Sequence, residues 1–136
     1  MTDVCALDRT DLEARPGSRV GGQRAGVVRL PGMTLEHALL PVRPGTEERF
    51  IEAFGEAKQI ISSMRGFRSL TLSRCIERPG TYLLLVVWDT LHDHTEGFRK
   101  SDEYQQWRRL LHHFYEPFPT VEHFEQVVRV GVTLDD

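Results

Sequence analysis

The sequence predicts an α+β domain in which two helices pack on one face of a four-stranded antiparallel sheet. Four short segments bounded by turn residues have the composition of strands, and apolar residues recur with the period of a helix in two others. These segments follow in the order strand, helix, strand, strand, helix, strand, which is the ferredoxin-like βαββαβ arrangement. A chain of 136 residues fits one such domain.

The composition is that of an ordinary globular protein with a slight negative charge. The chain is 40% hydrophobic and 27% charged, and its formal net charge is −3. No window approaches the run of about 18 apolar residues that a membrane span needs, and the negative charge argues against a dedicated nucleic-acid binder. The two cysteines form no CxxC motif, and the N-terminus lacks a signal-peptide core. We therefore expect a cytoplasmic protein with neither a membrane nor a nucleic acid as partner.

The first 32 residues differ from the remainder. They contain five Gly and five Arg but no aromatic residue, and no strand or helix period persists in them. We expect residues 1–32 to form an extended or flexible N-terminal arm and residues 33–136 to form the domain. Met33 is an alternative start of translation, and an arm docked on a partner subunit is a further alternative.

The first half of the domain is predicted to be a strand followed by an amphipathic helix. Thr34–Pro41 is the strand, and the Pro44-Gly45 turn follows it. Thr46 stands at the N-cap position ahead of two acidic residues, which suit the positive end of a helix dipole. Apolar residues then mark one helical stripe, which Gly66 ends: Phe50, Phe54, Ala57, Ile61 and Met64.

The second half is predicted to be a hairpin, two helical segments and a last strand. Ser101 is expected to cap the longer helix, with two acidic residues in its first turn. The predicted elements are a strand at Phe67–Glu77, a Pro-Gly turn at 78–81, a strand at Tyr82–Trp88, an irregular helix at Leu91–Lys100, a helix from Ser101 that ends by Pro117, and a strand at Thr120–Val130.

The third strand is apolar on both of its faces. A sheet covered by helices on one side only should alternate apolar and polar residues, but every residue of Tyr82–Trp88 is apolar. A second surface must therefore cover the other face. We expect a homodimer whose two sheets pack face to face, and the alternative is that the chain's own arm covers the strand.

Known catalytic motifs are missing, so candidate chemistry rests on the histidines, all of which lie between His37 and His123. No dinucleotide-binding, P-loop, zinc-protease or nucleophile-elbow pattern occurs, and Cys75 is expected to be an inert buried thiol. The dipeptides Glu36-His37 and Glu122-His123 lie on strands that are neighbours in this fold. Their pairing is expected to bring two imidazoles, or two carboxylates, across one ladder. No metal site is expected.

Aromatic and basic residues interleave along the second helical region. Phe98, Tyr104, Trp107, Phe114, Tyr115 and Phe118 alternate with arginines. Aromatic residues facing a sheet usually form core, but Tyr104 and Trp107 carry polar groups that need partners when buried. A cavity lined by these rings with His and Arg would suit a flat aromatic ligand bearing phenol or quinone oxygens.

Over residues 34–128 these features resemble the antibiotic biosynthesis monooxygenase family. The similar pieces are the Pro-Gly turn before the first helix, Gly66-Phe67, the Val-Val-Trp end of the third strand, the run Phe98-x-x-Ser101-x-x-Tyr104 and the short last strand after Pro117-Phe-Pro. The resemblance implies a dimeric α+β barrel with a pocket between helices and sheet in each subunit. It also implies oxidation of aromatic, often polyketide-type, substrates by O2 without flavin, metal or other cofactor.

The sequence departs from the haem-degrading members of that family. Those members carry Asn, Trp and His where this chain, aligned from the Pro-Gly turn and from Ser101, has Ala38, Phe98 and Arg108. Haem cleavage by their mechanism is therefore not expected. The same alignment turns Glu36, Ala38 and Leu40 toward the pocket, so Glu36 is a better acid/base candidate than His37.

The resemblance and the residues together give a set of candidate site residues. We expect Glu36 or His94 to act as the base and Arg108 to provide the counter-charge for a substrate anion. The residues expected to bind a small aromatic substrate are Ala38, Trp88, Phe98, Tyr104, Trp107 and His112. The alternatives are a haem- or metal-binding relative and a non-catalytic ligand-binding dimer.

Overall fold

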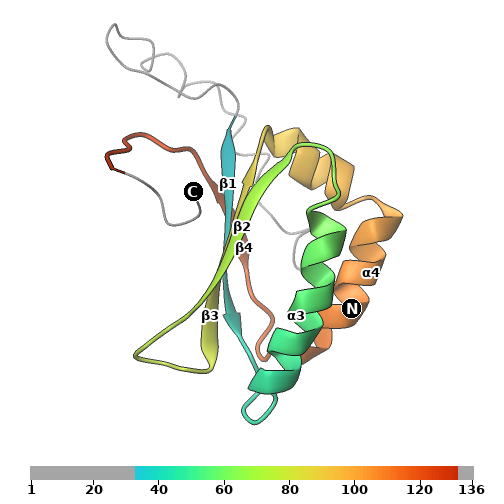
Figure 1. The fold of residues 1–136 in the computed structure, drawn as a ribbon, viewed down its shortest axis with the longest axis vertical. Helices are drawn as coiled ribbons and strands as arrows, with labels where there is room; N and C mark the ends of the chain where they lie inside the picture. The colour runs from blue at the N-terminus through green and yellow to red at the C-terminus, as the bar shows by residue number, and fades with distance from the viewer. Residues whose placement is uncertain (1–32, 132–136) are drawn as a thin grey trace, which may run out of the picture.

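The computed structural model describes residues 33–131. The arm expected over residues 1–32 lies outside the described residues. The described part has the predicted α+β ferredoxin-like architecture: a four-stranded antiparallel sheet with its helices on one side (Figure 1). Among residues 33–131, no helix combines the length and the apolar character that crossing a membrane requires.

The sheet has the strand order β2-β3-β1-β4. Its strands are β1 (Thr34–Pro41), β2 (Phe67–Arg74), β3 (Thr81–Trp88) and β4 (Val121–Phe124). All neighbouring strands are antiparallel, and β1 lies between β3 and β4. The first and last strands are therefore neighbours, as the βαββαβ order predicts. This pairing brings residues about 85 positions apart in the sequence onto one ladder.

Two α-helices and two shorter helical turns cover one face of the sheet. They are α3 (Glu47–Ile61), the π-helix η2 (Asp93–Phe98), α4 (Asp102–Leu111) and the 3-10 turn η3 (His112–Phe114). Ser101 caps α4 as predicted, because its Oγ accepts a hydrogen bond from the Tyr104 amide at 3.1 Å. The irregular helix predicted at Leu91–Lys100 corresponds to η2 and the turns that flank it.

Aromatic side chains fill the core between the helices and the sheet. Phe50 on α3 is central, and its ring centroid lies 5.1 Å from that of Tyr82 and 5.6 Å from that of Phe114. The helical stripe predicted from the sequence supplies the buried residues of α3, except that Met64 lies beyond the helix end and is only partly buried. The buried face of β3 is made by alternate residues from Tyr82 to Trp88.

Several predicted boundaries were wrong, and in the strands the cause is the partner strand. The last strand was expected to reach Val130 but ends at Phe124, because Phe124 pairs with Leu35 and β1 begins one residue before that. The second strand was expected to reach Glu77 but ends at Arg74, which pairs with Tyr82 near the start of β3. Cys75 consequently follows β2 and is partly exposed rather than buried.

The start of α3 also differs from the expected cap. The Thr46 hydroxyl donates to the carbonyl of Arg43 at 2.7 Å and makes no capping bond to the helix. Instead, the Glu47 carboxylate accepts from the Gly45 amide at 3.0 Å. The Glu47 carboxylate and the Thr46 hydroxyl therefore both bond to the turn that precedes the helix, and the acidic first turn has the charge that suits the positive end of the helix dipole.

Gly66 ends the α3 segment and also positions η2. Its φ of 86° favours glycine, and a Cβ atom there would collide with the side chain of Asp93, the first residue of η2. Gly45 has nearly the same φ, 85°, with open space around it. Comparing substitutions at Gly45 and Gly66 therefore distinguishes the cost of backbone strain, which both positions share, from the cost of steric contact, which only Gly66 has.

We expect Gly45→Ala to reduce the free energy of unfolding by about 1 kcal/mol, through backbone strain alone. Gly66→Ala should cost about 1–3 kcal/mol more, because η2 has to move to admit the new methyl group. Urea unfolding followed by circular dichroism measures both differences. Equal losses in the two variants would show that Gly66 does not constrain the position of η2.

Candidate functional site

A buried carboxylate and two imidazoles form one cluster between the sheet and η2. Glu36 lies on the buried face of β1, and His94 lies in η2 with only 1% of its surface exposed. His123 on β4 is directly opposite Glu36 in the ladder, so both side chains lie on the helix-covered face of the sheet. We call Glu36, His94 and His123 the acid–imidazole chain.

Consecutive members of the acid–imidazole chain are within hydrogen-bonding distance. Nε2 of His94 is 3.3 Å from Oε1 of Glu36, and Nδ1 of His94 is 2.8 Å from Nε2 of His123. The indole Nε1–H of Trp88, at the end of β3, donates to the same Glu36 oxygen at 3.0 Å. The buried carboxyl group is therefore held by two other elements, as a buried polar group requires.

The π-helix determines where His94 points. The Arg99 amide donates to the His94 carbonyl at 2.9 Å, which is the i to i+5 bond that defines this wider turn. The imidazole stacks on the Trp88 indole with a centroid distance of 5.4 Å and an interplanar angle of 20°. Single π-helical turns within proteins are often found at functional sites.

Burial and a nearby cation keep both imidazoles neutral. Desolvation is the largest cause that lowers the pKa of His94 well below its usual value, and the charges of His123 and Arg99 act in the same direction. For His123 the pKa falls to about 4, first through burial and then through the charge of Arg99. Near neutral pH each ring therefore carries a single N–H proton.

This protonation fixes the direction of the hydrogen bonds. The Trp88 N–H can only donate, so Oε1 of Glu36 is an acceptor. When Glu36 is ionised, the His94 proton is on Nε2 and points to Glu36, and the His123 proton is on Nε2 and points to Nδ1 of His94. Every contact then has one donor and one acceptor, and both N–H groups are oriented toward the carboxylate.

The ladder pairs acid with imidazole and not like with like. Glu36 is opposite His123, and His37 is opposite Glu122, so the expected juxtaposition of two imidazoles or two carboxylates was wrong. When two Glu-His dipeptides lie opposite each other on antiparallel strands, the Glu of each pairs with the His of the other. This rule could have identified His123 as the partner of Glu36 from the sequence. His37 and Leu39 alternate with Glu36 and Ala38 and lie on the other, less buried face of β1.

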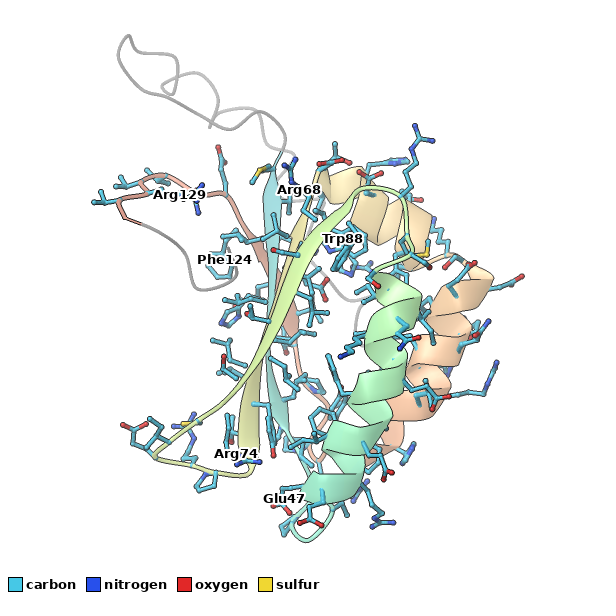
Figure 2. The ribbon with its side chains drawn as sticks, viewed as in Figure 1. Glu47, Arg68, Arg74, Trp88, Phe124 and Arg129 are labelled. Atoms are coloured by element: carbon cyan, nitrogen blue, oxygen red, sulfur yellow. The ribbon has the colours of Figure 1, made fainter. Side chains whose placement is uncertain are left out.

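Most of the aromatic residues that were expected to bind the substrate pack around the acid–imidazole chain and form a wall beside it. The ring of Phe98 lies 5.8 Å from Trp88, 5.3 Å from Tyr104 and 5.7 Å from Trp107. Ala38 is buried two residues along β1 from Glu36. In Figure 2 the labelled Trp88 lies on the side of the sheet that carries α3, opposite Phe124 and Arg129. The structure thus brings together Glu36 and His94 with Trp88 and the rings packed around Phe98.

Arg108 and His112 lie in a separate hollow, which we call the outer pocket. Its volume is about 450 Å³, and its lining residues are Gln105, Arg108, Arg109, His112, His113 and Phe118. The ring of Tyr104 lies 6.0 Å from His112 and therefore separates the outer pocket from Phe98. The cation that acts on the acid–imidazole chain is Arg99, which sequence reasoning missed and which directly follows η2.

Among residues 33–131, no group of three or more His, Cys, Asp or Glu side chains has the geometry of a metal site. In the acid–imidazole chain, both ring nitrogens of His94 already face hydrogen-bond partners. The acid–imidazole chain is thus arranged so that it can hold and pass on protons, and the surrounding aromatic side chains shield it from water.

Comparisons with known proteins agree with this fold. The family model of the antibiotic biosynthesis monooxygenases matches residues 33–110. The uncharacterized protein YczJ of Bacillus subtilis (strain 168) is 56% identical over 95 residues, which are 70% of this chain and all of YczJ. A crystal structure from Bordetella bronchiseptica that carries the family's name is 35% identical, with a TM-score of 0.68 over 71% of this chain and 99% of the other.

A more distant structure has the same fold. SnoaB of Streptomyces nogalater, a cofactor-independent oxygenase, is 18% identical with a TM-score of 0.54, and the match covers 74% of this chain and 95% of SnoaB. An α+β ferredoxin-like domain with a buried acid–imidazole chain is thus the class that the fold and site define. The chain belongs to the antibiotic biosynthesis monooxygenase family.

The lowered pKa values predict how stability depends on pH. Between pH 6.5 and about 4 the unfolded chain protonates His123 whereas the folded chain does not, so stability is complete above pH 6.5 and falls as the pH falls. We expect the urea midpoint of the wild type to decrease between about pH 7 and pH 5, and His123→Gln to flatten this decrease. His92→Gln, which alters an exposed imidazole, is the matched control. Identical slopes in all three proteins would contradict the assignment.

Proposed function

We propose that this protein is a cofactor-independent monooxygenase that oxidises a phenolic or quinol-type aromatic substrate, including polyketide-type compounds, with O2. The observation that carries the proposal is the acid–imidazole chain, a potential base buried against Trp88 and walled by aromatic rings. Family membership supports it, and so does the shared fold of SnoaB, itself a cofactor-independent oxygenase. A reduced Cys75 is compatible with a cytoplasmic location, which we also propose.

The reaction needs no electron donor other than the substrate. A base removes a proton from a phenol or from the acidic CH2 group of its keto form, and the anion passes one electron to O2. The substrate radical and superoxide combine, forming a C–O bond, and protonation gives a hydroperoxide. Loss of the second hydrogen from that carbon then breaks the O–O bond and releases water. One oxygen atom remains as a quinone carbonyl and the other leaves as water, so atoms and electrons balance.

The acid–imidazole chain supplies the base and a route for its proton. When Glu36 takes up a proton, Oε1–H can donate to Nε2 of His94 if the His94 proton has moved to Nδ1, and the same shift in His123 moves its proton from Nε2 to Nδ1. From that state Glu36 passes its proton to Nε2 of His94, and His94 passes its Nδ1 proton to Nε2 of His123. His123 then gives its Nδ1 proton to an acceptor outside the cluster, so that Glu36 is ionised again and both imidazoles are neutral. This agrees with the lowered pKa of both rings.

The surrounding residues have distinct roles in this proposal. Trp88 holds the Glu36 oxygen through its N–H, and Phe98 and Trp107 keep the reacting anion away from water. His123 lies on the edge strand β4 and is a positioning residue that takes the proton from His94. Arg99 is the cation near the chain, whereas Arg108 belongs to the outer pocket and meets the substrate there.

O2 consumption with a hydroquinone or a dihydroanthracenone tests the proposal. Glu36→Gln keeps the shape of the side chain but removes the base, and we expect turnover to fall by about 10²–10⁴-fold. Glu52→Gln is the matched control, because Glu52 lies exposed on α3, away from both the acid–imidazole chain and the uncovered sheet face. Retention of turnover in Glu36→Gln, or an equal loss in both variants, would sink the proposal.

The same assay examines the role of His123. His123→Ala should slow turnover about tenfold, and added imidazole should restore it because imidazole can carry a proton. Pyrrole has a similar shape but no basic nitrogen, and it should not restore turnover. Equal rescue by both compounds would reduce His123 to a structural residue.

We also propose a homodimer through the sheet face that the helices leave uncovered. Leu39 on β1 is 46% exposed and Phe124 on β4 is 48% exposed. On the other side of β1 from β4, β3 presents the leucine and valine side chains of its less buried face, from Leu83, which pairs with Leu39, to Val87. A second copy offers the same apolar surface, so a two-fold axis allows the two sheets to cover each other.

Light scattering tests the dimer. The double variant Leu39→Glu/Phe124→Glu should convert the dimer to a monomer at micromolar concentration, because it buries two carboxylates in the interface of each subunit. Ile51→Glu is the matched control, since Ile51 is 43% exposed on α3, on the helical side of the sheet. A monomeric wild type would overturn this part of the proposal.

A further inference from the structure

The outer pocket is lined by basic and aromatic groups and by no carboxylate. Its lining contains two arginines, two histidines, a glutamine and a phenylalanine, in a chain whose net charge is −3. The ring of His112 lies 5.1 Å from that of Phe118 at an angle of 80°. A hollow of about 450 Å³ is within the usual range for small-molecule sites.

Two polar groups of the outer pocket have hydrogen-bond partners within the described residues. The guanidinium of Arg108 donates from Nη1 to the side-chain oxygen of Gln105 at 3.1 Å, one helical turn earlier. At the far end of the lining, the carbonyl of His113 accepts from Nε of Arg43 at 3.0 Å. Arg43 also pairs with the nearby carboxylate of Glu116 at 3.4 Å, so that negative charge is already engaged.

A helix dipole accounts for part of this arrangement. Arg108 and Arg109 lie in the last turn of α4, where cations suit the partial negative charge of the helix end. The dipole does not account for the cavity or for its walls of His112 and Phe118. A ring-walled hollow whose lining includes two arginines is suited to a flat ligand that carries an anionic oxygen group.

We propose that the outer pocket binds a planar aromatic carboxylate, with its anionic group on Arg108 and Arg109 and its ring against His112 and Phe118. The inference rests on the proposed function, because it identifies the substrate as an aromatic acid. Tyr104 contacts both His112 and Phe98, so a ligand in the outer pocket lies against the wall that encloses the acid–imidazole chain. The acidic substituent would anchor the substrate while its oxidisable ring is directed toward that wall.

Binding of 2-naphthoate to the full chain tests the inference without requiring turnover. Calorimetry and the NMR signals of His112 and His113 would report affinity and location. We expect 2-naphthamide, a neutral molecule of the same shape, to bind at least about tenfold more weakly, and added salt to weaken only the naphthoate. Arg108→Gln and Arg109→Gln should each lower naphthoate affinity about tenfold, whereas Arg49→Gln, at an exposed position on α3, should leave it unchanged.

Other results would overturn the inference. Equal affinity for naphthoate and naphthamide, or equal affinity in Arg108→Gln and Arg49→Gln, would reduce the two pocket arginines to partners of the helix dipole. The two proposals can fail separately. Naphthoate binding at His112 without O2 consumption on any aromatic acid or neutral quinol would overturn the oxygenase alone. Turnover of neutral quinols with no preference for acids would overturn the anion site alone.

Discussion

The burial of the Glu36 carboxyl group is the constraint on which the rest of the site depends. A carboxyl group removed from water is tolerated only with hydrogen-bond donors around it, and β1 itself cannot supply them because its backbone groups pair with β3 and β4. The donors therefore come from elsewhere: the indole of Trp88 and the imidazole of His94. The widened π-helical turn directs His94 to the sheet, and Gly66 leaves room for the start of that turn. One buried oxygen thus explains the placement of residues on three elements.

Much of the fold follows from local patterns. Most helices and strands were predictable because their apolar pattern reflects packing against a single core, as in the stripe that includes Phe50, whereas β3 was predictable as a run of apolar residues. The strand ends were not predictable in the same way. The run after Phe124 is apolar enough for a strand, but a strand ends where its partner ends, and the length of β1 is a property of a segment about 90 residues away.

The candidate site was predictable only in part, for a related reason. The alternation along β1 identifies Glu36 as facing the helices, and Trp88 and Phe98 follow from their strand and helical turn. The role of His94 could be assigned only from its contact with His123, and that contact depends on the register of β1 with β4. Arg108 was grouped with Glu36 because both belong to one predicted pocket, but the intervening ring of Tyr104 separates them. Sequence spacing places a side chain on a helix face and does not show what packs between two faces.

The separation of Arg108 from Glu36 has a chemical consequence. A guanidinium in contact with a carboxylate stabilises its charged form and makes it a weaker base, so an arginine cannot both pair with Glu36 and leave it able to abstract a proton. A substrate anion nevertheless needs a cation to hold it. Placing Arg108 and Arg109 beyond Tyr104, in a pocket open to solvent, lets these two arginines engage a substituent of the ligand and not the base itself. The neutral imidazole of His94 then takes the position next to Glu36, where it can accept the proton of Glu36 without competing for its charge.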